Sequence, residues 1–268
     1  MNKFLLILLI FLTNCSLSSP DKRNDLINEL NLNKFNKKIY TTSHFDIYSL
    51  EKIRNNKKLI IYIEGDGVSW INRNTISSNP TPSDPLAFKM ALIDGSENII
   101  YLARPCQYEW SDNCNKDIWT TSQYSRAVLK SYKEIINHLS KTYKEIHLVG
   151  YSGGAGIAMY IGTLKNESIK TIRTVAGNIN HNELSKILNI SKLKKSINFY
   201  SIEKKLKKIP QIHYYGLNDN TVPNELHTSY ELRNLGNTCI KIKSADKASH
   251  NEGWLDFWSN NSNKLPSC

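Results

Sequence analysis

Hydrophobic residues along this chain fall into short, nearly continuous runs. The strongest of them are residues 58–63 (KLIIYI) and residues 98–103 (NIIYLA). Runs of this kind are typical of strands that are buried on both faces of a sheet. Two strands at residues 38–42 and 45–50 are expected to form an antiparallel start of the domain. Later strands are predicted at residues 145–149, 171–175, 211–215 and 238–242.

Helical periodicity marks the stretches between these strands. Helices are predicted at residues 86–93, 123–140, 155–164 and 225–235. Strands that alternate with helices at this spacing predict an α/β fold, in which a mostly parallel sheet is flanked by helices. Residues 181–208 interrupt the alternation with two short helical patterns, and we expect them to form a small helical cap over the site.

Length and charge narrow the possible classes of protein. The chain has 268 residues, 40% of them hydrophobic, which suits one globular domain and a short leader. The formal net charge is +11, mostly from lysines spread over the chain. No interleaved basic and aromatic motif is present, so we expect no nucleic acid partner. The densest basic stretch, residues 192–208, is interpreted as a solvated face rather than a specific anion site.

The first residues have the pattern of an export signal. Lys3 precedes an unbroken apolar run at residues 4–12, which has the length of a signal-peptide core and is too short to span a bilayer. The run leads into Leu12-Thr13-Asn14-Cys15, which resembles the lipobox of bacterial lipoproteins, although Asn14 stands where that motif has a small residue. The resemblance implies cleavage before Cys15 and acylation of that cysteine. A plain secretory leader is the alternative.

On this interpretation the chain has three parts. Residues 1–14 are a lipoprotein signal peptide, residues 15–37 are a tether, and residues 38–268 are the folded domain. Several acyl chains on Cys15 would anchor the protein stably in a membrane. Ser16 follows, and by resemblance to the sorting rule of Gram-negative envelopes a residue other than Asp there favours the outer membrane. The expected location is therefore the bacterial cell envelope.

Four of the five cysteines remain when Cys15 is set aside. An oxidising compartment would allow them to form two disulfides. Of the possible pairings we prefer Cys106–Cys114, which closes a short polar loop, and Cys239–Cys268, which would join the C-terminus to a late strand. No cysteine pair has CxxC spacing or a nearby histidine, so we expect neither a metal site nor a cofactor.

Residues 150–154 (GYSGG) match the pattern G-x-S-x-G, with Ser152 at its centre. They lie directly after the predicted strand EIHLV and directly before the helical run AGIAMYIG. This is the strand–turn–helix setting of a nucleophile elbow, in which small flanking residues permit a tight turn that exposes the serine hydroxyl. A purely structural glycine-rich turn is the alternative.

This elbow resembles that of the α/β-hydrolase superfamily, and the resemblance covers nearly all of the chain from Lys38 on. The stretches YIEGDG, YLARPCQY and GYSGGA also resemble a group of bacterial α/β-hydrolase lipoproteins. The superfamily order of serine, acid and histidine implies Asp219 as the acid and His250 as the base. The alternatives are that Asp219 only forms an Asx turn and that His250 is an ordinary surface residue.

The resemblance also implies two backbone N–H groups that stabilise a developing negative charge. One belongs to Gly153, and by position the other belongs to Asp66 in the loop EGDG at residues 64–67. Many relatives have His-Gly in this loop, so its two carboxylates depart from the common pattern. They must point away from the anion or pair with a cation such as Arg104 or Arg73.

Together these residues predict a serine hydrolase that cleaves a carboxylic ester or a thioester through an acyl-enzyme on Ser152. The expected partners are a small-molecule or lipid ester as substrate, and a membrane through the anchor at Cys15. Two alternatives stay open: a non-catalytic, envelope-binding lipoprotein of the same fold, and a serine peptidase. Intact Ser152, Asp219 and His250 favour an enzyme over a binding protein.

Overall fold

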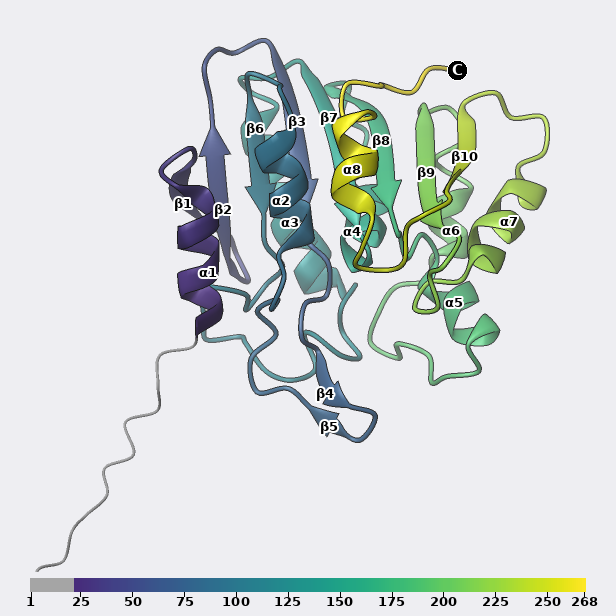
Figure 1. The fold of residues 1–268 in the computed structure, drawn as a ribbon, viewed down its shortest axis with the longest axis horizontal. Coiled ribbons are helices and arrows are strands. Elements are labelled where there is room, and N and C mark those ends of the chain that lie inside the picture. Colours follow the sequence, from purple (N-terminus) through teal and green to yellow (C-terminus); the bar gives the residue numbers. More distant parts are fainter. Residues whose placement is uncertain (1–21) are drawn as a thin grey trace, which may run out of the picture.

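The computed structural model describes residues 22–268 and contains one eight-stranded sheet with helices on both faces (Figure 1). The strand order is β1-β2-β6-β3-β7-β8-β9-β10. The strands of this sheet are β1 (Asn36–Thr41), β2 (Asp46–Lys52), β3 (Lys58–Ile63), β6 (Ile99–Leu102), β7 (Glu145–Tyr151), β8 (Ile169–Val175), β9 (Gln211–Gly216) and β10 (Ile240–Ala245). Within this eight-stranded sheet, only the pairs β1–β2 and β2–β6 are antiparallel. The expected mostly parallel sheet with an antiparallel start is confirmed.

The helices form a layer on each face of the sheet. In Figure 1, α2 (Leu86–Ile93) and α8 (Trp254–Ser259) lie in front of the strands, and α3 (Arg126–Leu139) and α4 (Gly153–Gly162) lie behind them. The helices α5 (His181–Ile187), α6 (Tyr200–Glu203) and α7 (Asn224–Arg233) lie toward the β9–β10 end. Of these, α5 and α6 fall within the expected cap, residues 181–208.

Strand β3 shows how a continuous apolar run serves both layers. Leu59, Ile61 and Ile63 pack in the cluster that includes α3 and α4, whereas Ile60 and Tyr62 pack in the cluster that includes α2 and α8. None of these five side chains is more than 2% exposed. Because successive side chains of a strand point to opposite faces, an apolar residue is needed at every position.

The segment that we expected to be a tether, residues 15–37, is partly folded. Residues Lys22–Asn31 form α1, and Ile27 on this helix is 1% exposed. Arg23 Nη1 donates hydrogen bonds to the carbonyl oxygens of Asn79 at 3.1 Å and Thr81 at 2.8 Å. The sequence did not predict this helix, because few of its residues contact the core and its composition is mostly polar. The predicted signal peptide, residues 1–14, and Cys15 lie outside the described residues.

The sequence pattern did not indicate one further element. A short hairpin of β4 (Trp70–Asn72) and β5 (Thr75–Ile76) lies below the carboxyl edge of the main sheet (Figure 1). Its strands are too short for an alternating pattern to be recognised. Within residues 22–268, no helix combines the length and the apolar character needed to cross a membrane.

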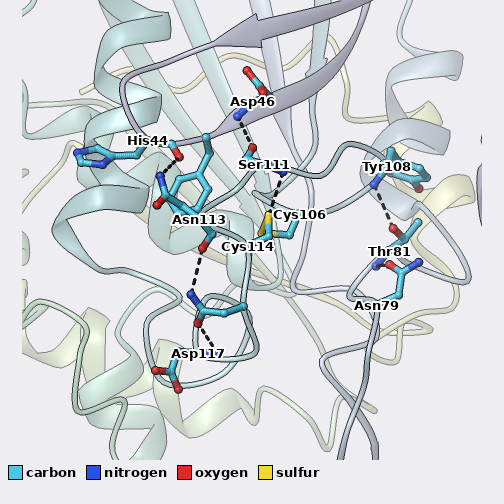
Figure 2. The surroundings of a disulfide bond; sticks show 12 residues. His44, Asp46, Asn79, Thr81, Cys106, Tyr108, Ser111, Asn113, Cys114 and Asp117 are labelled. Atoms are coloured by element: carbon cyan, nitrogen blue, oxygen red, sulfur yellow. Dashed lines mark hydrogen bonds between the residues drawn. A yellow bond between two sulfur atoms is a disulfide. The ribbon is translucent and has the colours of Figure 1, made fainter.

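Both preferred disulfides are present. Cys106 and Cys114 are bonded, with their Cα atoms 5.7 Å apart, and Cys239 is bonded to Cys268. Figure 2 shows that the loop closed by the first bond is tied to the start of β2: Ser111 Oγ accepts a hydrogen bond from the Asp46 N–H at 2.7 Å. Asn113 Nδ2 donates to the His44 carbonyl at 2.9 Å. The disulfide therefore constrains a loop that leaves the carboxyl end of β6.

Candidate active site

Ser152 lies in the sharp turn between β7 and α4, at the carboxyl edge of the sheet. Its φ of 48° and ψ of −119° are values that a non-glycine residue adopts only under strain. The Ser152 N–H donates to the carbonyl of Val175 at 3.0 Å, and the Ser152 carbonyl accepts from the N–H of Asn178 at 2.9 Å. These bonds to the end of β8 hold the strained turn in place.

Two glycines beside Ser152 make the turn possible. A Cβ atom on Gly154 would lie 2.3 Å from the carbonyl oxygen of Ile63 on the neighbouring strand β3. A Cβ atom on Gly153 would lie 2.1 Å from a carboxylate oxygen of Asp66. Both distances are far below van der Waals contact, so a side chain at either position would displace β3 or the loop that follows it.

The structure brings together the three residues identified from their order in the chain. Ser152 Oγ lies 2.9 Å from His250 Nε2, and His250 Nδ1 lies 2.9 Å from Asp219 Oδ2. The Asp219 side chain is fully buried, and that of His250 is 14% exposed. Asp219 Oδ1 accepts hydrogen bonds from the N–H groups of Thr221 and Val222, both at 2.8 Å. One carboxylate therefore closes its own turn and also faces the imidazole.

Aromatic side chains fix the loop that carries His250. Trp254 Nε1 donates to the carbonyl oxygens of Ser249 at 2.8 Å and His250 at 3.1 Å. The Tyr151 hydroxyl donates to the same His250 carbonyl at 3.1 Å. Because Tyr151 directly precedes Ser152 in the chain, this bond ties the histidine loop to the turn that carries the serine.

The other histidines that follow Ser152 take no part in this series of hydrogen bonds. His213 Nδ1 pairs with Thr174 Oγ1 at 2.8 Å inside the sheet, and burial lowers the pKa of His213 to about 3. Burial likewise lowers the pKa of His227 to about 4. His181 on α5 stacks on Tyr124, with ring centroids 5.3 Å apart.

The loop after β3 approaches Ser152 directly. A Cβ atom on Gly65 would lie 3.1 Å from Ser152 Cβ. Gly153 is the first residue of α4, so its N–H has no acceptor within the helix. The two residues expected to donate to an oxyanion, Gly153 and Asp66, thus lie on backbone segments that meet beside Ser152.

The Asp66 carboxylate is paired with Arg104, one of the two cations that the sequence offered. Arg104 Nη1 lies 2.8 Å from Asp66 Oδ1, and Arg104 Nη2 donates to the Gln123 carbonyl at 2.8 Å. The Arg104 side chain is 6% exposed, so it needs a counter-ion, and Asp66 supplies it. Arg73, the other candidate, is exposed near the β4–β5 hairpin.

Two side chains connect this ion pair to the turn. The Tyr124 hydroxyl donates to the Gly153 carbonyl at 3.0 Å, and the Arg104 guanidinium lies 5.4 Å from the centroid of the Tyr124 ring. Gln107 Oε1 accepts from the Arg104 N–H at 3.0 Å, and Gln107 Nε2 donates to the Gly65 carbonyl at 3.1 Å. Gln107 belongs to the loop that the Cys106–Cys114 disulfide closes.

Glu64, the other carboxyl group in the loop, is 1% exposed and is not part of that ion pair. Its Oε1 accepts hydrogen bonds from the N–H groups of Gly65 at 2.9 Å and Ala87 at 3.4 Å. Burial raises the pKa of Glu64 to about 7, against the weaker opposing effect of these hydrogen bonds. Near neutral pH the group is therefore protonated in a large fraction of molecules.

A cleft of about 950 Å³ lies near the Ser152 turn, although Ser152 and His250 are not among its lining residues. It lies between the β4–β5 hairpin and α5 with the segment that follows it, and Asn178, which bonds to Ser152, forms part of its wall. Its apolar lining comes from Trp70, Leu184, Leu188, Ile190 and Leu193. Sequence reasoning missed Asn178 and Trp70; the position of Asn178 just after β8, at the edge where active-site loops collect, was a usable signal.

Comparison with known families agrees with this geometry. Residues 83–245 match the family described as serine hydrolase (FSH1). The matched segment contains Ser152 and Asp219, whereas His250 lies beyond it. None of the curated proteins matches the sequence.

Solved structures share the fold at low sequence identity. The chain is similar to the Pyrococcus furiosus esterase Pf2001, with a TM-score of 0.59 and 16% identity over 85% of this chain and 90% of that one. It is similar to Est1E from Butyrivibrio proteoclasticus, with a TM-score of 0.61 and 11% identity over 84% and 94%. For the mouse alpha/beta hydrolase domain-containing protein 10 the values are 0.57 and 10%, over 85% and 96%. At such identities the likeness shows the fold.

Glu64→Gln should change how stability depends on pH. The folded state keeps the Glu64 proton up to a pKa of about 7, whereas the unfolded chain releases it near 4.5. Wild-type stability from this group is therefore complete below pH 4.5 and is lost as the pH rises through 7. The quantity to compare is the unfolding free energy of Glu64→Gln minus that of wild type. We expect this difference to be about 2–3 kcal/mol larger at pH 8 than at pH 4.5.

Urea unfolding of both proteins at pH 4.5 and pH 8 measures this change. Subtracting the wild-type result at each pH removes the contribution of all other titrating groups. A difference between the variants that is the same at both values of pH would contradict the burial of an ionisable Glu64.

Proposed function

Because the chain belongs to the FSH1 serine hydrolase family, we propose that Ser152 is the nucleophile with which this esterase-like enzyme attacks carboxylic esters or thioesters. The single observation that carries the proposal is the continuous series of hydrogen bonds from Ser152 Oγ through His250 to Asp219, at 2.9 Å in each step. A serine hydroxyl is a weak nucleophile alone, and a base within hydrogen-bond reach activates it.

The distances support the role that we propose for each group. His250 Nε2 takes the proton from Ser152 Oγ as the oxygen bonds to the acyl carbon, and it returns the proton to the leaving alcohol or thiol. Asp219 accepts the Nδ1–H of His250, which fixes the tautomer and stabilises the imidazolium. Water then attacks the acyl-enzyme with His250 again as the base, releasing the acid and restoring Ser152.

The tetrahedral intermediate places a negative charge on the former carbonyl oxygen. The N–H groups of Gly153 and Asp66 are the donors that we assign to this oxyanion. The ten-residue helix α4 begins at Gly153, so its positive end also faces the reacting centre. A backbone donor on an aspartate is compatible with this role only if its carboxylate is neutralised.

Arg104 meets that condition. A carboxylate packed against Gly153 would repel the oxyanion, and the partly buried ion pair with Arg104 cancels that repulsion. The disulfide-closed loop holds Arg104 through Gln107. We assign Arg104 as a positioning residue that acts through Asp66.

The cleft lined by Trp70, Leu184 and Leu193 is the place that we assign to the apolar part of the ester. Its volume of about 950 Å³ is at the upper end of the range for small-molecule sites. An apolar acyl chain gains free energy by leaving water for such walls.

The N-terminal pattern supports a location for this activity. The apolar run at residues 4–12 and the sequence LTNC ending at Cys15 favour a lipoprotein signal peptide, with an acylated Cys15 as the membrane anchor. Ser16 favours the outer membrane over retention in the inner one.

Ser152→Ala should abolish hydrolysis of a short acyl ester. Losing the nucleophile of a triad typically lowers kcat by orders of magnitude, so we expect a fall of at least about 10³-fold with an unchanged circular dichroism spectrum. Initial rates on a chromogenic ester measure it. Activity within about tenfold of wild type, only ~1.4 kcal/mol of barrier, would exclude Ser152 as the nucleophile.

Arg104→Gln should lower kcat for the same ester by about tenfold or more, because it leaves the Asp66 carboxylate unpaired beside the oxyanion. Asp66→Asn keeps the backbone N–H and removes the charge, so the double variant Arg104→Gln/Asp66→Asn should recover most of that loss. A folded double variant that is no faster than Arg104→Gln would show that Arg104 does not act through the charge of Asp66.

Cys15→Ser should abolish lipidation. Cells grown with an alkyne fatty acid should label the wild-type protein and leave the Cys15→Ser variant unlabelled. The control is Cys239→Ser, which changes a cysteine of the folded domain and should keep the label. Equal labelling of wild type and Cys15→Ser would rule out the anchor.

A further inference from the structure

The mouth of the cleft exposes large apolar side chains. Trp70 is 46% exposed and Ile71 is 66% exposed, both on β4 of the hairpin. Ile190, in the segment after α5, is 57% exposed. Trp70 and Ile190 both line the cleft, and Ile71 follows Trp70 on β4 without lining it. We use the name cleft rim for six exposed residues: Trp70, Ile71, Arg73, Ile190, Lys192 and Lys194.

The two segments that form the cleft rim carry charge of one sign. Residues 67–78 contain Arg73 and no acidic residue, and residues 188–198 contain Lys192, Lys194 and Lys195 and no acidic residue. Lys195 pairs with Asp117 from another loop, whereas Arg73, Lys192 and Lys194 are exposed. Exposed apolar side chains with exposed cations on the same segments are the composition of a surface that binds anionic lipid.

The start of the folded chain lies on the same side of the molecule. In Figure 1, the first turn of α1 lies at the lower edge of the sheet, and the β4–β5 hairpin lies below that same edge. Hydrogen bonds from Arg23 to the carbonyls of Asn79 and Thr81 fix that end of α1 to the loop that follows the hairpin. A chain held to a membrane just before Lys22 would therefore present the cleft rim to that membrane.

We propose that the cleft rim docks on an anionic lipid bilayer, and that the cleft takes its ester substrate from that bilayer. The second half of this statement rests on the proposed function. Trp70, Ile71 and Ile190 enter the interfacial region, where an indole ring is especially favoured. Arg73, Lys192 and Lys194 face the lipid phosphates. Docking places the open side of the cleft against the lipids and shortens the path of an acyl chain to Ser152.

Vesicle binding tests the surface without relying on catalysis. The full chain carrying Ser152→Ala is sedimented with vesicles of phosphatidylcholine and phosphatidylglycerol, and the same protein is compared with Trp70→Ser/Ile71→Ser added. The matched control adds Leu232→Ser/Leu235→Ser, which changes two side chains on and just after α7 that are 61% and 74% exposed. All three proteins share the same N-terminal segment.

We expect the cleft-rim variant to partition to these vesicles at least about tenfold more weakly, and the α7 control to stay within about twofold. We also expect weaker binding to vesicles of phosphatidylcholine alone. Equal binding of the cleft-rim and control variants would overturn the proposal, as would binding that does not depend on the anionic lipid. Either of these two contradicting results is what we would expect if the cleft rim bound a protein instead of a membrane.

Hydrolysis tests the second half. With an active Ser152, Ile71→Asp should cut the rate on a long-chain ester embedded in anionic vesicles about tenfold and leave the rate on a dissolved short-chain ester within about twofold. Ile71 does not line the cleft, so a loss on both esters, or on neither, would contradict delivery from the bilayer. A wild type that is inactive on both esters would refute the proposed function instead, and the vesicle-binding result would stand independently.

Discussion

The strained turn at Ser152 sets where the serine hydroxyl and the start of α4 lie relative to the sheet. A φ of 48° is unfavourable for serine, and the turn persists because bonds to Val175 and Asn178 on one side and close packing against β3 on the other hold it. Strain of this kind costs of order 1–3 kcal/mol, which the buried sheet around it offsets. Because of this turn, the Ser152 hydroxyl is exposed at the edge of the sheet, and α4 begins at the next residue.

The same close packing creates an electrostatic problem. Gly153 brings α4 so near the loop after β3 that the Asp66 carboxylate occupies the space that a Cβ atom at this position would need. The charge of Asp66 is cancelled by Arg104, a buried arginine just after β6. The charge of Glu64, two residues earlier, is reduced in a different way: burial raises the pKa of this group and so favours its protonated, neutral form. Both carboxyl groups of the loop are thus kept from presenting an unpaired charge.

Much of this arrangement could be predicted from the sequence, because its signals are local. The run KLIIYI indicates a doubly buried strand, GYSGG between a strand and a helix indicates the elbow, and chain order singles out Asp219 and His250. Other features depend on contacts that are distant in the sequence. The choice of Arg104 over Arg73 as the partner of Asp66 follows from where the loop after β6 lies. Helix α1 has too few core contacts to show a hydrophobic pattern, and β4 and β5 are too short to alternate.

Ser152, activated by His250, is the group that we propose reacts with the substrate. Treating the pure protein with a fluorophosphonate and mapping the adduct by peptide mass spectrometry tests this proposal most directly. The geometry predicts a single adduct on Ser152, formed rapidly in wild type and at least about 10²-fold more slowly in His250→Ala. An adduct on another residue, or equal labelling of wild type and His250→Ala, would contradict it.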